Sequence, residues 1–373
     1  MAVAMLLATV TFAQGYPQKT LGAKTDKWVK VASKYNDSFF TTDEARRIGD
    51  NVLLYQQTTG GWPKNVKMQE PLDSAEKAAV AGEKTNVNES TIDNGATTTE
   101  IIYLARLYNA TNERKYLDAF MGGMDYLFRS QYDNGGWPQF WPRPKGYYTH
   151  ITYNDDAMVN VLKIMRDVAK GKKPFAFVPD STRAKAKVAL DKGVDCILKT
   201  QVRQNGKLTV WCAQHDEHTL LPAKARAYEL ASLSGQESDG IVLFLMSLSK
   251  PSEAMKQCIE AAVEWFRTSM ITGMKMEHFT NSDGKPDRRL VKCGEDEQCE
   301  PLWGRFYTLD TNRPFVCDRD GQPKYDISEI GYERRNGYSW YNNGGLWVFK
   351  EYEEWKREKA GRQSVRNIIA QQP

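Results

Sequence analysis

The hydrophobic residues of the chain recur at helical spacing through most of its length. In residues 97–108 (TTTEIIYLARLY), Ile101, Leu104 and Tyr108 fall on one face, three or four residues apart, which is typical of an amphipathic helix. The same spacing occurs at residues 115–128, 155–167, 182–198, 238–248, 254–266 and 346–352. Alternation of apolar and polar residues, the pattern of a strand, is confined to short runs. The pattern therefore predicts a mainly α protein.

A short motif recurs at a nearly constant interval. Trp62, Trp137 and Trp211 are spaced by 75 and 74 residues, and each follows a glutamine at the end of a predicted helix. A fixed period that carries one supersecondary unit indicates a repeat in which each unit packs against the next. Chance recurrence of a Gly-Gly-Trp turn is the alternative, but three matches at near-equal spacing favour the repeat. We expect helical hairpins arranged in a closed α/α toroid, with long loops gathered at one end.

Residues 275–342 differ from the rest of the chain. Helical spacing fades there, and glycine, proline, aspartate and arginine become frequent. Loops of this length in a compact domain are usually functional or disordered, and the many aromatic residues argue against disorder. We therefore expect a single domain over residues 14–361, with functional loops at 275–342 and a loosely held C-terminal tail at 362–373.

The N-terminal residues indicate export. Met1–Ala13 form an apolar run followed by polar residues, as in a secretory signal peptide, although no lysine or arginine precedes the run. A buried N-terminal helix is the alternative. The run is shorter than the roughly 20 residues that span a bilayer, and no later segment reaches about 18 uninterrupted apolar residues. We expect a secreted or periplasmic protein without a membrane span.

Composition excludes several classes of protein. The 51 basic and 47 acidic residues give a net charge of +4, too balanced for a dedicated nucleic-acid binder. Six cysteines are too few for a disulfide scaffold, although Cys293 and Cys299 flank a polar segment and could close a small loop. The remaining cysteines lie in apolar settings and are interpreted as packing residues. No phosphate-binding motif occurs, so nucleotide chemistry has no support. The 10 tryptophans and 18 tyrosines have flat apolar rings with a polar edge, which suit the corners of a core, an interface or the face of a sugar.

Two polar clusters precede predicted helices. The first contains Asp93 and Asn94, with Glu100 on the helix that follows, and the second contains Asn154 and Asp155. Any one of these side chains could simply cap its helix. Together they gather the oxygen ligands that calcium takes in irregular geometry. The pair of clusters favours a cation site, with Asn94 and Glu100 as further ligand candidates from proximity alone.

Cationic residues form two more groups. Lys224, Arg226 and Glu229 in KARAYEL would suit a solvated helix face. The other group lies in the aromatic loops and consists of Arg313, Arg319, Arg334 and Arg335. Because guanidinium binds planar carboxylates at two points, these arginines suit a carboxylated sugar polymer. Neighbouring acidic residues could equally neutralise them, and the His215–His218 spacing is a weak metal signal.

The longest motifs of the chain resemble the pectate lyases of polysaccharide lyase family 10. They are TGGWPKN (59–65), TIDNGATTTEI (91–101), GGWPQF (135–140), YNDDAM (153–158), VWCAQH (210–215), KARAYEL (224–230), NRPFVCDRDG (312–321) and ISEIGYERRNGYSW (327–340). The resemblance implies an (α/α)₃ toroid and calcium-assisted β-elimination of polygalacturonate (pectate) chains by a monomer. Residues 283–301, with their cysteine pair, do not match the family.

The resemblance also implies roles for individual residues. It assigns the Ca²⁺ ligands to Asp93 and Asp155 and the base that abstracts the C5 proton to Arg226. It assigns substrate binding to Lys224, Arg313, Arg319 and Arg334. Calcium on the substrate carboxylate would make the C5 proton acidic. Arginine is an awkward base because its pKa lies above about 12. We therefore expect either that neighbours, calcium included, lower the pKa of Arg226 or that its position matters only in the transition state. Either way, high pH should favour the reaction.

Two alternatives remain open at the level of sequence. An inverting glycoside hydrolase acting on an acidic polysaccharide could use Asp93 with Asp155 or Glu100 as its two carboxyl groups. A non-catalytic pectin-binding protein could use the same groove. Arg226 within KARAYEL favours the lyase.

Overall fold

The computed structural model describes residues 16–17, 27–143 and 145–370, and side chains as far as residue 358. The predicted signal peptide at residues 1–13 lies outside this part of the chain. The chain divides into two compact units. Unit 1 contains the residues up to Tyr132, with Trp137–Thr149 and Asn160–Leu190, and unit 2 contains Asp133–Gly136, His150–Val159 and the residues from Asp191 onward. A single domain over residues 14–361 stays a prediction.

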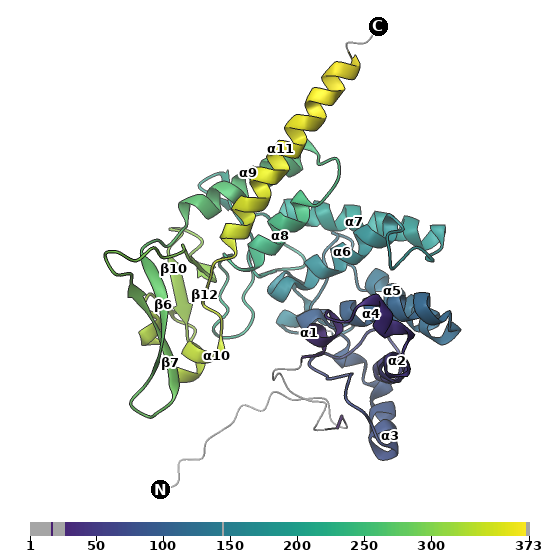
Figure 1. Ribbon diagram of the computed structural model, residues 1–373. Helices are drawn as coiled ribbons and strands as arrows, with labels where there is room; N and C mark the ends of the chain where they lie inside the picture. The colour runs from purple at the N-terminus through teal and green to yellow at the C-terminus, as the bar shows by residue number, and fades with distance from the viewer. Residues whose placement is uncertain (1–15, 18–26, 144, 371–373) are drawn as a thin grey trace. The chain divides into compact units, whose positions relative to one another are not determined.

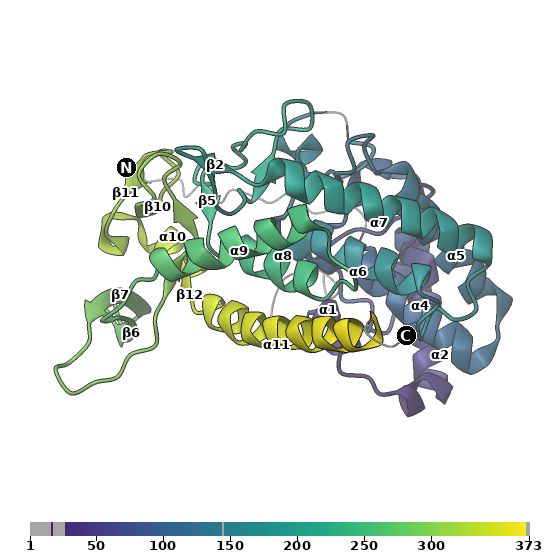
Figure 2. The same ribbon diagram turned by 90° about the horizontal axis from the view of Figure 1, so that it is seen from above.

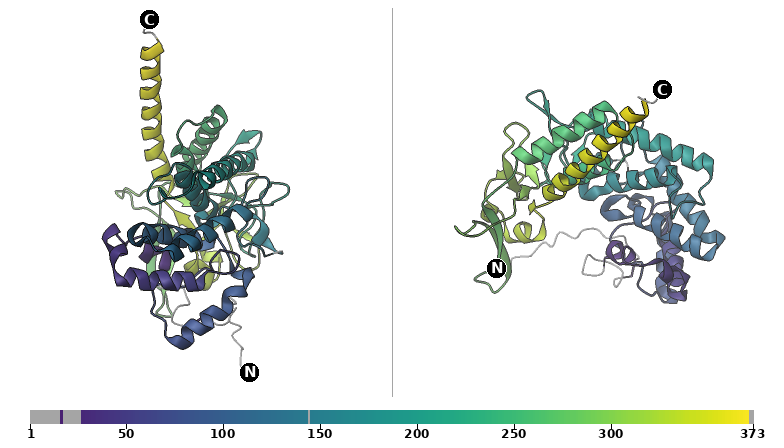
Figure 3. Two further views of the ribbon diagram at one scale, coloured as in Figure 1. Left: turned by 90° about the vertical axis from the view of Figure 1, so that its right-hand side faces the viewer. Right: turned by 45° about the horizontal axis from the view of Figure 1, so that its top comes forward.

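Helices dominate the described chain, as the hydrophobic spacing predicted (Figure 1). They are α1 (Trp28–Ala32), α2 (Asp43–Tyr55), α3 (Ser74–Gly82), α4 (Thr98–Thr111), α5 (Arg114–Arg129), α6 (Ala157–Ala169), α7 (Asp180–Thr200), α8 (Glu237–Met246), α9 (Glu253–Thr268), α10 (Tyr332–Gly337) and α11 (Gly345–Ala370). Figure 3 shows α11 as one continuous helix, which extends past the tail boundary expected at residue 361.

Local chemistry sets several helix ends. Asn112 adopts a left-handed conformation with φ 55° and ends α4, so the chain turns directly into α5. Ser252 begins α9 by accepting a hydrogen bond from the backbone N–H of Met255 at 3.2 Å. Each of these two turns joins two helices that contact each other, α4 with α5 and α8 with α9. In Figure 2, α8, α9 and α11 lie side by side.

Strands are more frequent in residues 275–342 than the expected loops allow. The strands are β1 (Ile151–Thr152), β2 (Arg203–Gln204), β3 (Lys207–Leu208), β4 (Gln214–His215), β5 (Leu233–Ser234), β6 (Met274–Thr280), β7 (Pro286–Lys292), β8 (Trp303–Gly304), β9 (Phe306–Tyr307), β10 (Pro314–Cys317), β11 (Pro323–Lys324) and β12 (Tyr341–Asn342). β6 and β7 pair antiparallel from Met274 opposite Lys292 to Thr280 opposite Pro286. A four-stranded sheet has the order β11-β10-β9-β5. The prediction of loops alone is therefore wrong for this region.

The tryptophan repeat is present in the structure. Trp62, Trp137 and Trp211 are fully buried, and each indole donates a hydrogen bond of 2.8 Å to a backbone carbonyl of the helix before it. Trp303 makes the same contact with Phe266 at 2.9 Å and is a fourth copy that the sequence spacing missed. Burying the indole N–H with a partner avoids the penalty of an unpaired donor.

Glycine is required where the repeated turn meets a helix. Gly60 and Gly135 both have φ of +93°. A Cβ on Gly60 would lie 2.3 Å from the carbonyl oxygen of Gly122, and one on Gly135 would lie 2.0 Å from that of Lys192. Only glycine combines this backbone angle with so close an approach.

The cysteines behave as the sequence suggested. Cys293 and Cys299 form a disulfide within unit 2. The free cysteines in the described residues are buried, and they are Cys196, Cys212, Cys258 and Cys317.

Candidate active site

The KARAYEL segment forms a turn in unit 2, and the interpretation as a solvated helix face is wrong. The backbone N–H of Ala225 bonds the carbonyl of Glu229 at 2.9 Å, and the N–H of Glu229 bonds the carbonyl of Arg226 at 2.9 Å. This tight turn places the two side chains of Arg226 and Glu229 beside each other.

Arg226 binds Glu229 at two points. Its Nε donates to Oε2 at 2.7 Å and its Nη2 to Oε1 at 2.5 Å. Glu229 is only 6% exposed, whereas the side chain of Arg226 is 43% exposed. Nη1 of Arg226 is the guanidinium nitrogen for which no contact is found among the described residues. The pair therefore fixes the plane of the guanidinium and leaves one nitrogen facing away from Glu229.

The protein neighbours of Arg226 do not lower its pKa. Burial acts to lower it, but the hydrogen bonds and charge of Glu229 outweigh burial and raise the pKa of Arg226 above its ordinary value. In the same way, burial acts to raise the pKa of Glu229, yet Arg226 holds it below the ordinary value. The protein's own groups therefore do not supply a lowered pKa for Arg226, and a contribution from calcium stays a prediction.

Three of the predicted arginines gather around one aromatic ring. The guanidinium carbons of Arg334, Arg226 and Arg319 lie 4.3, 4.9 and 5.9 Å from the centroid of Tyr228. A second ring, Tyr338, lies 5.8 Å from both Arg226 and Arg334, and its hydroxyl donates to Glu229 at 2.7 Å. Cation–π attraction helps to hold several like charges close together.

The predicted substrate binders differ in how far they are neutralised. Glu333 pairs with Arg334 and also with Arg319, at 3.2 Å, as the acidic-neighbour alternative anticipated. Arg313 lies 3.4 Å above the ring of Tyr325 and is exposed. Lys224 is exposed as well. No ion pair is found for Arg313 or Lys224 within the described residues, so both cations are available to an anionic ligand.

Asp155 lies in unit 2 beside a buried arginine. It has a left-handed backbone, with φ 51°, and accepts a hydrogen bond from the side chain of Asn154 at 2.9 Å. Arg305 Nη2 lies 3.5 Å from Asp155 Oδ1, 3.1 Å from the Asn154 side-chain oxygen and 2.6 Å from Glu237. Arg305 and Glu237 are buried. Burial raises the pKa of Glu237, although the charge of Arg305 opposes that shift.

Asp93 lies in unit 1 and is 3% exposed. Lys64 forms a short ion pair with its Oδ2 atom. Its Oδ1 atom is buried, and no hydrogen-bond partner is found for it among the described residues. The N-cap position of the helix that follows is Thr97, which makes no side-chain cap, so Asp93 does not cap this helix. Because buried polar atoms are normally hydrogen-bonded, the unpaired oxygen of Asp93 supports a role as a metal ligand rather than as a helix cap.

Glu100 is buried at the start of α4, and its role as a calcium ligand stays a prediction. It is 1% exposed and accepts a hydrogen bond from the indole of Trp28 at 2.8 Å. Burial raises its pKa to about 8, so the carboxyl group is mostly neutral at pH 7. Its second oxygen, Oε2, is buried and, like Oδ1 of Asp93, has no hydrogen-bond partner found among the described residues.

The HDEH segment uses its side chains in ordinary contacts. His215 is fully buried between the carbonyl of Leu220 and the N–H of Cys212, and burial lowers its pKa to about 4. Glu217 pairs with His150 at 2.9 Å, and Asp216 accepts bonds from the turn that follows it. His215 is therefore occupied by backbone contacts, whereas ligand atoms of His150, Asp216 and Glu217 lie within 4.8 Å of one another.

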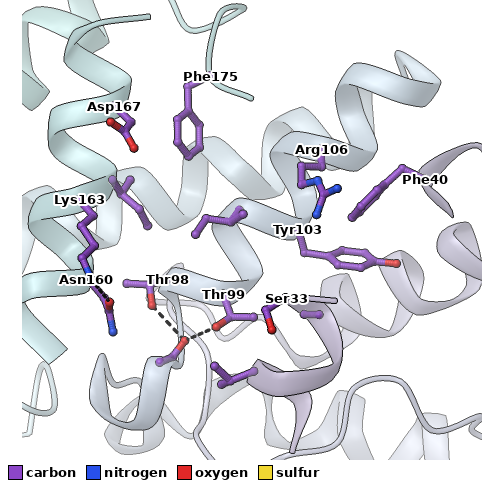
Figure 4. Close-up of a pocket in the computed structure, with 15 residues that line it drawn as sticks. Ser33, Phe40, Thr98, Thr99, Tyr103, Arg106, Asn160, Lys163, Asp167 and Phe175 are labelled. Atoms are coloured by element: carbon purple, nitrogen blue, oxygen red, sulfur yellow. Dashed lines mark hydrogen bonds between the residues drawn. The ribbon is translucent and has the colours of Figure 1, made fainter. Parts of the chain in front are cut away.

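A separate pocket of about 380 Å³ lies in unit 1 (Figure 4). Phe40, Tyr103 and Phe175 line it, and Thr98 and Thr99 both donate to the carbonyl of Gly95 at its floor, at 3.0 and 2.7 Å. None of the predicted site residues lines this pocket.

Comparison with known proteins decides the family. A model of the pectic acid lyase family matches residues 56–348. The chain belongs to the pectic acid lyase family. Two solved structures of a family 10 polysaccharide lyase from Cellvibrio cellulosa are similar to this lyase, one of them a mutant in complex with trigalacturonic acid. Each is 37% identical, covering 88% of this chain and 95% of the other, with TM-scores of 0.70 and 0.71. No curated protein sequence matches.

These matches confirm three predictions. The resemblance to family 10 is confirmed, as are the mainly α fold class and the activity of a pectate or polysaccharide lyase. The alternatives of a glycoside hydrolase and of a non-catalytic binding protein have no support from the matches. Among the described residues, the lyase has no helix long and apolar enough to cross a membrane.

The sequence assigns no site role to four residues around the predicted site of the lyase. Glu229 holds Arg226 and accepts a hydrogen bond from Tyr338, while Arg305 contacts both Asp155 and Glu237. Glu229 lies in KARAYEL, but its spacing predicts a solvated helix face. Arg305 stands between the apolar residues Trp303 and Phe306, and this position is the one sequence feature that indicates a buried arginine.

Proposed function

We propose that this lyase cleaves polygalacturonate by calcium-assisted β-elimination, with Arg226 accepting the C5 proton. The observation that carries the proposal is the geometry of Arg226. Glu229 holds two of its nitrogens, the third faces away, and Arg319 and Arg334 surround the same tyrosine ring. One fixed guanidinium among other cations suits a substrate that carries a carboxylate on every sugar.

The other cations are proposed to bind substrate carboxylates. Arg334 is buried and fixed by Glu333, whereas Arg319, Arg313 and Lys224 are exposed. The structural relative that binds trigalacturonic acid supports this choice of ligand. Because arginine binds a carboxylate at two points, each contact would fix a sugar ring's orientation as well as its charge.

Asp93 and Asp155 are the proposed calcium ligands, each argued within its own unit. The unpaired buried oxygen of Asp93 supports the first, and the exposed carboxylate of Asp155 beside Asn154 supplies the hard oxygen donors that calcium prefers. Bound calcium would supply Lewis-acid neutralisation of the substrate carboxylate next to C5.

The elimination transfers the C5 proton to Arg226 and shifts two bonding electron pairs. Neutral Arg226 accepts the C5 proton, the C5–H electrons form the C4–C5 double bond, and the C4–O bond breaks with its electrons on the departing sugar oxygen, which takes up a proton from solvent. Glu229 raises the pKa of Arg226, so the neutral base is rare near pH 7. The rate should therefore rise with pH.

Setting and assembly are also part of the proposal. A polymeric acidic substrate suits action outside the cytoplasm, so we propose a secreted or periplasmic enzyme that degrades pectin as a monomer.

The product identifies the reaction. We would incubate the full chain with polygalacturonate, with calcium and with a chelator, and follow ultraviolet absorbance and reducing ends together. Elimination predicts absorbance that grows in step with new reducing ends and stops in chelator. Reducing ends without absorbance would contradict the proposal.

A further inference from the structure

The β6–β7 hairpin holds the helix that carries Arg334. Figure 1 shows the hairpin beside α10, and β7 contacts that helix. Asp287 on β7 accepts two hydrogen bonds of 2.7 Å from Arg335 and one of 2.9 Å from Asn336. Asp287 is 4% exposed, and the bonds from Arg335 lower its carboxyl pKa below the ordinary range. The carboxylate therefore remains charged and bound to α10 at neutral pH.

The next residue of β7, Arg288, binds the same C-terminal end of α10, and Pro286 meets its start. Arg288 Nε donates to the backbone carbonyl of Arg335 at 2.6 Å, and its Nη2 donates to the carbonyl of Tyr338. Tyr332, at the start of the helix, donates to the carbonyl of Pro286 at 2.9 Å. Pro286, Asp287 and Arg288 of β7 thus bind both ends of α10. Arg288 does so through backbone carbonyls at the C-terminal end, where a helix leaves carbonyls without an intrahelical partner.

Apolar contacts place the hairpin against the same core. Met276 and Leu290 lie opposite each other in the strand pair and pack on a cluster that includes Tyr228 and Trp340. The hairpin therefore packs on the cluster that contains Tyr228, the ring around which the arginines gather. Its position is set by burial as well as by ion pairs.

The helix α10 leads directly to two residues of the candidate active site. Arg334 lies 4.3 Å over Tyr228, and Tyr338 follows the helix and donates to Glu229. Glu229 in turn holds Arg226. A shift of α10 would move a proposed substrate cation and a hydrogen bond to the partner of the proposed base at the same time.

We propose that Asp287 and Arg288 are positioning residues for the lyase reaction, acting through α10 on Arg334 and Tyr338. This inference rests on the proposed function. It also assigns a role to residues 283–301, which contain both side chains and lie between the long motifs named above. Neither residue touches substrate in this proposal.

A purely structural role makes a different prediction. If the hairpin only stabilised the fold, Asp287→Asn would lower the melting temperature, but folded protein would keep full activity at low temperature. A positioning role lowers activity in fully folded protein, because displacement of catalytic groups by about 1 Å can reduce a rate about 100-fold.

The test compares two neutralising substitutions on one hairpin. Asp287→Asn removes the carboxylate that binds α10. Glu277→Gln removes a carboxylate whose ion pair, with Arg289 at 2.5 Å, is half-exposed and stays within the hairpin. Arg335→Lys is a second variant in case Asp287→Asn does not fold, since lysine keeps the charge but not the two-point bond. For each we would measure hydrogen exchange at residues 332–340, kcat, KM and the pH profile, well below the melting temperature.

We expect faster exchange at residues 332–340 and at least about a tenfold loss of kcat/KM in Asp287→Asn or Arg335→Lys. Because the Tyr338–Glu229 contact changes, the pH profile should shift as well. Glu277→Gln should match the wild type in every measurement. Unchanged exchange would overturn the inference, as would faster exchange with unchanged kcat/KM. Absence of elimination by the wild type would instead overturn the proposed function, and the inference with it.

Discussion

Arg226 and Glu229 are joined by two parallel hydrogen bonds, of 2.7 and 2.5 Å, between an accessible guanidinium and a buried carboxylate. The carboxylate serves two opposing purposes in the proposed mechanism. It orients the guanidinium of Arg226, and it raises the pKa of Arg226, so that the neutral, basic form is harder to reach. Orientation and basicity are therefore linked through one residue.

The first prediction separates these two effects. Glu229→Gln keeps the size of the side chain but removes its charge. Loss of an opposite charge at this distance should lower the pKa of Arg226. More neutral arginine would then form at a given pH, so the rising part of the kcat–pH profile should move to lower pH. An unmoved profile, measured alongside the wild type, would show that ionisation of Arg226 does not limit the rate.

The second prediction concerns calcium and Asp93. Asp93→Asn removes the charge of a buried carboxylate with one unpaired oxygen. We expect the calcium concentration for half-maximal activity to rise by about tenfold or more, because ligand charge sets calcium affinity. Asp50→Asn is the control, since Asp50 is half-exposed and binds Lys115. Equal calcium dependence in both variants would remove Asp93 from the ligand set.

The third prediction concerns stability and Glu100. Burial raises its pKa from 4.5 to about 8 in the folded state. The unfolded chain therefore releases this proton first as pH rises. The free energy of unfolding should fall between about pH 4.5 and 8 and level off above, by at most about 5 kcal/mol at about 1.4 kcal/mol per pKa unit.

Glu100→Gln should reduce this fall, because glutamine does not ionise. Urea unfolding at pH 5 and pH 8 would measure the difference. Glu253→Gln, at an exposed ion pair on α9, should keep the pH dependence of the wild type. The same fall in Glu100→Gln as in the wild type would mean that other groups cause it.

The fourth prediction concerns the repeated turn. Gly60→Ala would place a methyl group 2.3 Å from a backbone oxygen at φ of +93°. We expect the free energy of unfolding to fall by about 2–4 kcal/mol. Gly82 has an ordinary helical φ of −63° and open space around it, so Gly82→Ala should change stability by less than about 1 kcal/mol. Similar urea midpoints for the two variants would contradict this account of the turn.

The helices α4 to α9 could be predicted because their apolar residues recur at helical spacing, whereas the shorter α1, α3 and α10 were not predicted. The β6–β7 hairpin could not, because both of its faces are largely half-exposed and its residues do not alternate clearly. Trp303 was not recognised as a member of the repeat because its spacing differs. The hairpin and disulfide loop place it 37 residues after Phe266, whereas Trp62 follows its helix partner Val52 by 10.

The site shows a second limit of sequence reasoning. The three-residue spacing of Arg226 and Glu229 also fits a helix surface, and only the structure shows a turn and a buried carboxylate. Arg305 and Glu237 are 68 residues apart, so no local pattern joins them. Long motifs identified the family, but burial and distant pairing had to come from the fold.

The central claim is that Arg226 accepts the C5 proton. The most direct measurement is the initial rate of absorbance growth on polygalacturonate with saturating calcium, for the wild type, Arg226→Ala and Arg267→Ala. Arg267 is the matched control, because it also pairs with a glutamate three residues away, Glu264 at 2.6 Å, but lies half-exposed on α9. All three proteins would be compared at a temperature where each is folded.

We predict that Arg226→Ala lowers kcat by about 10²–10⁴-fold, the usual contribution of a general base, while Arg267→Ala matches the wild type. A folded Arg226→Ala variant that retains wild-type kcat would contradict the assignment of Arg226 as the base.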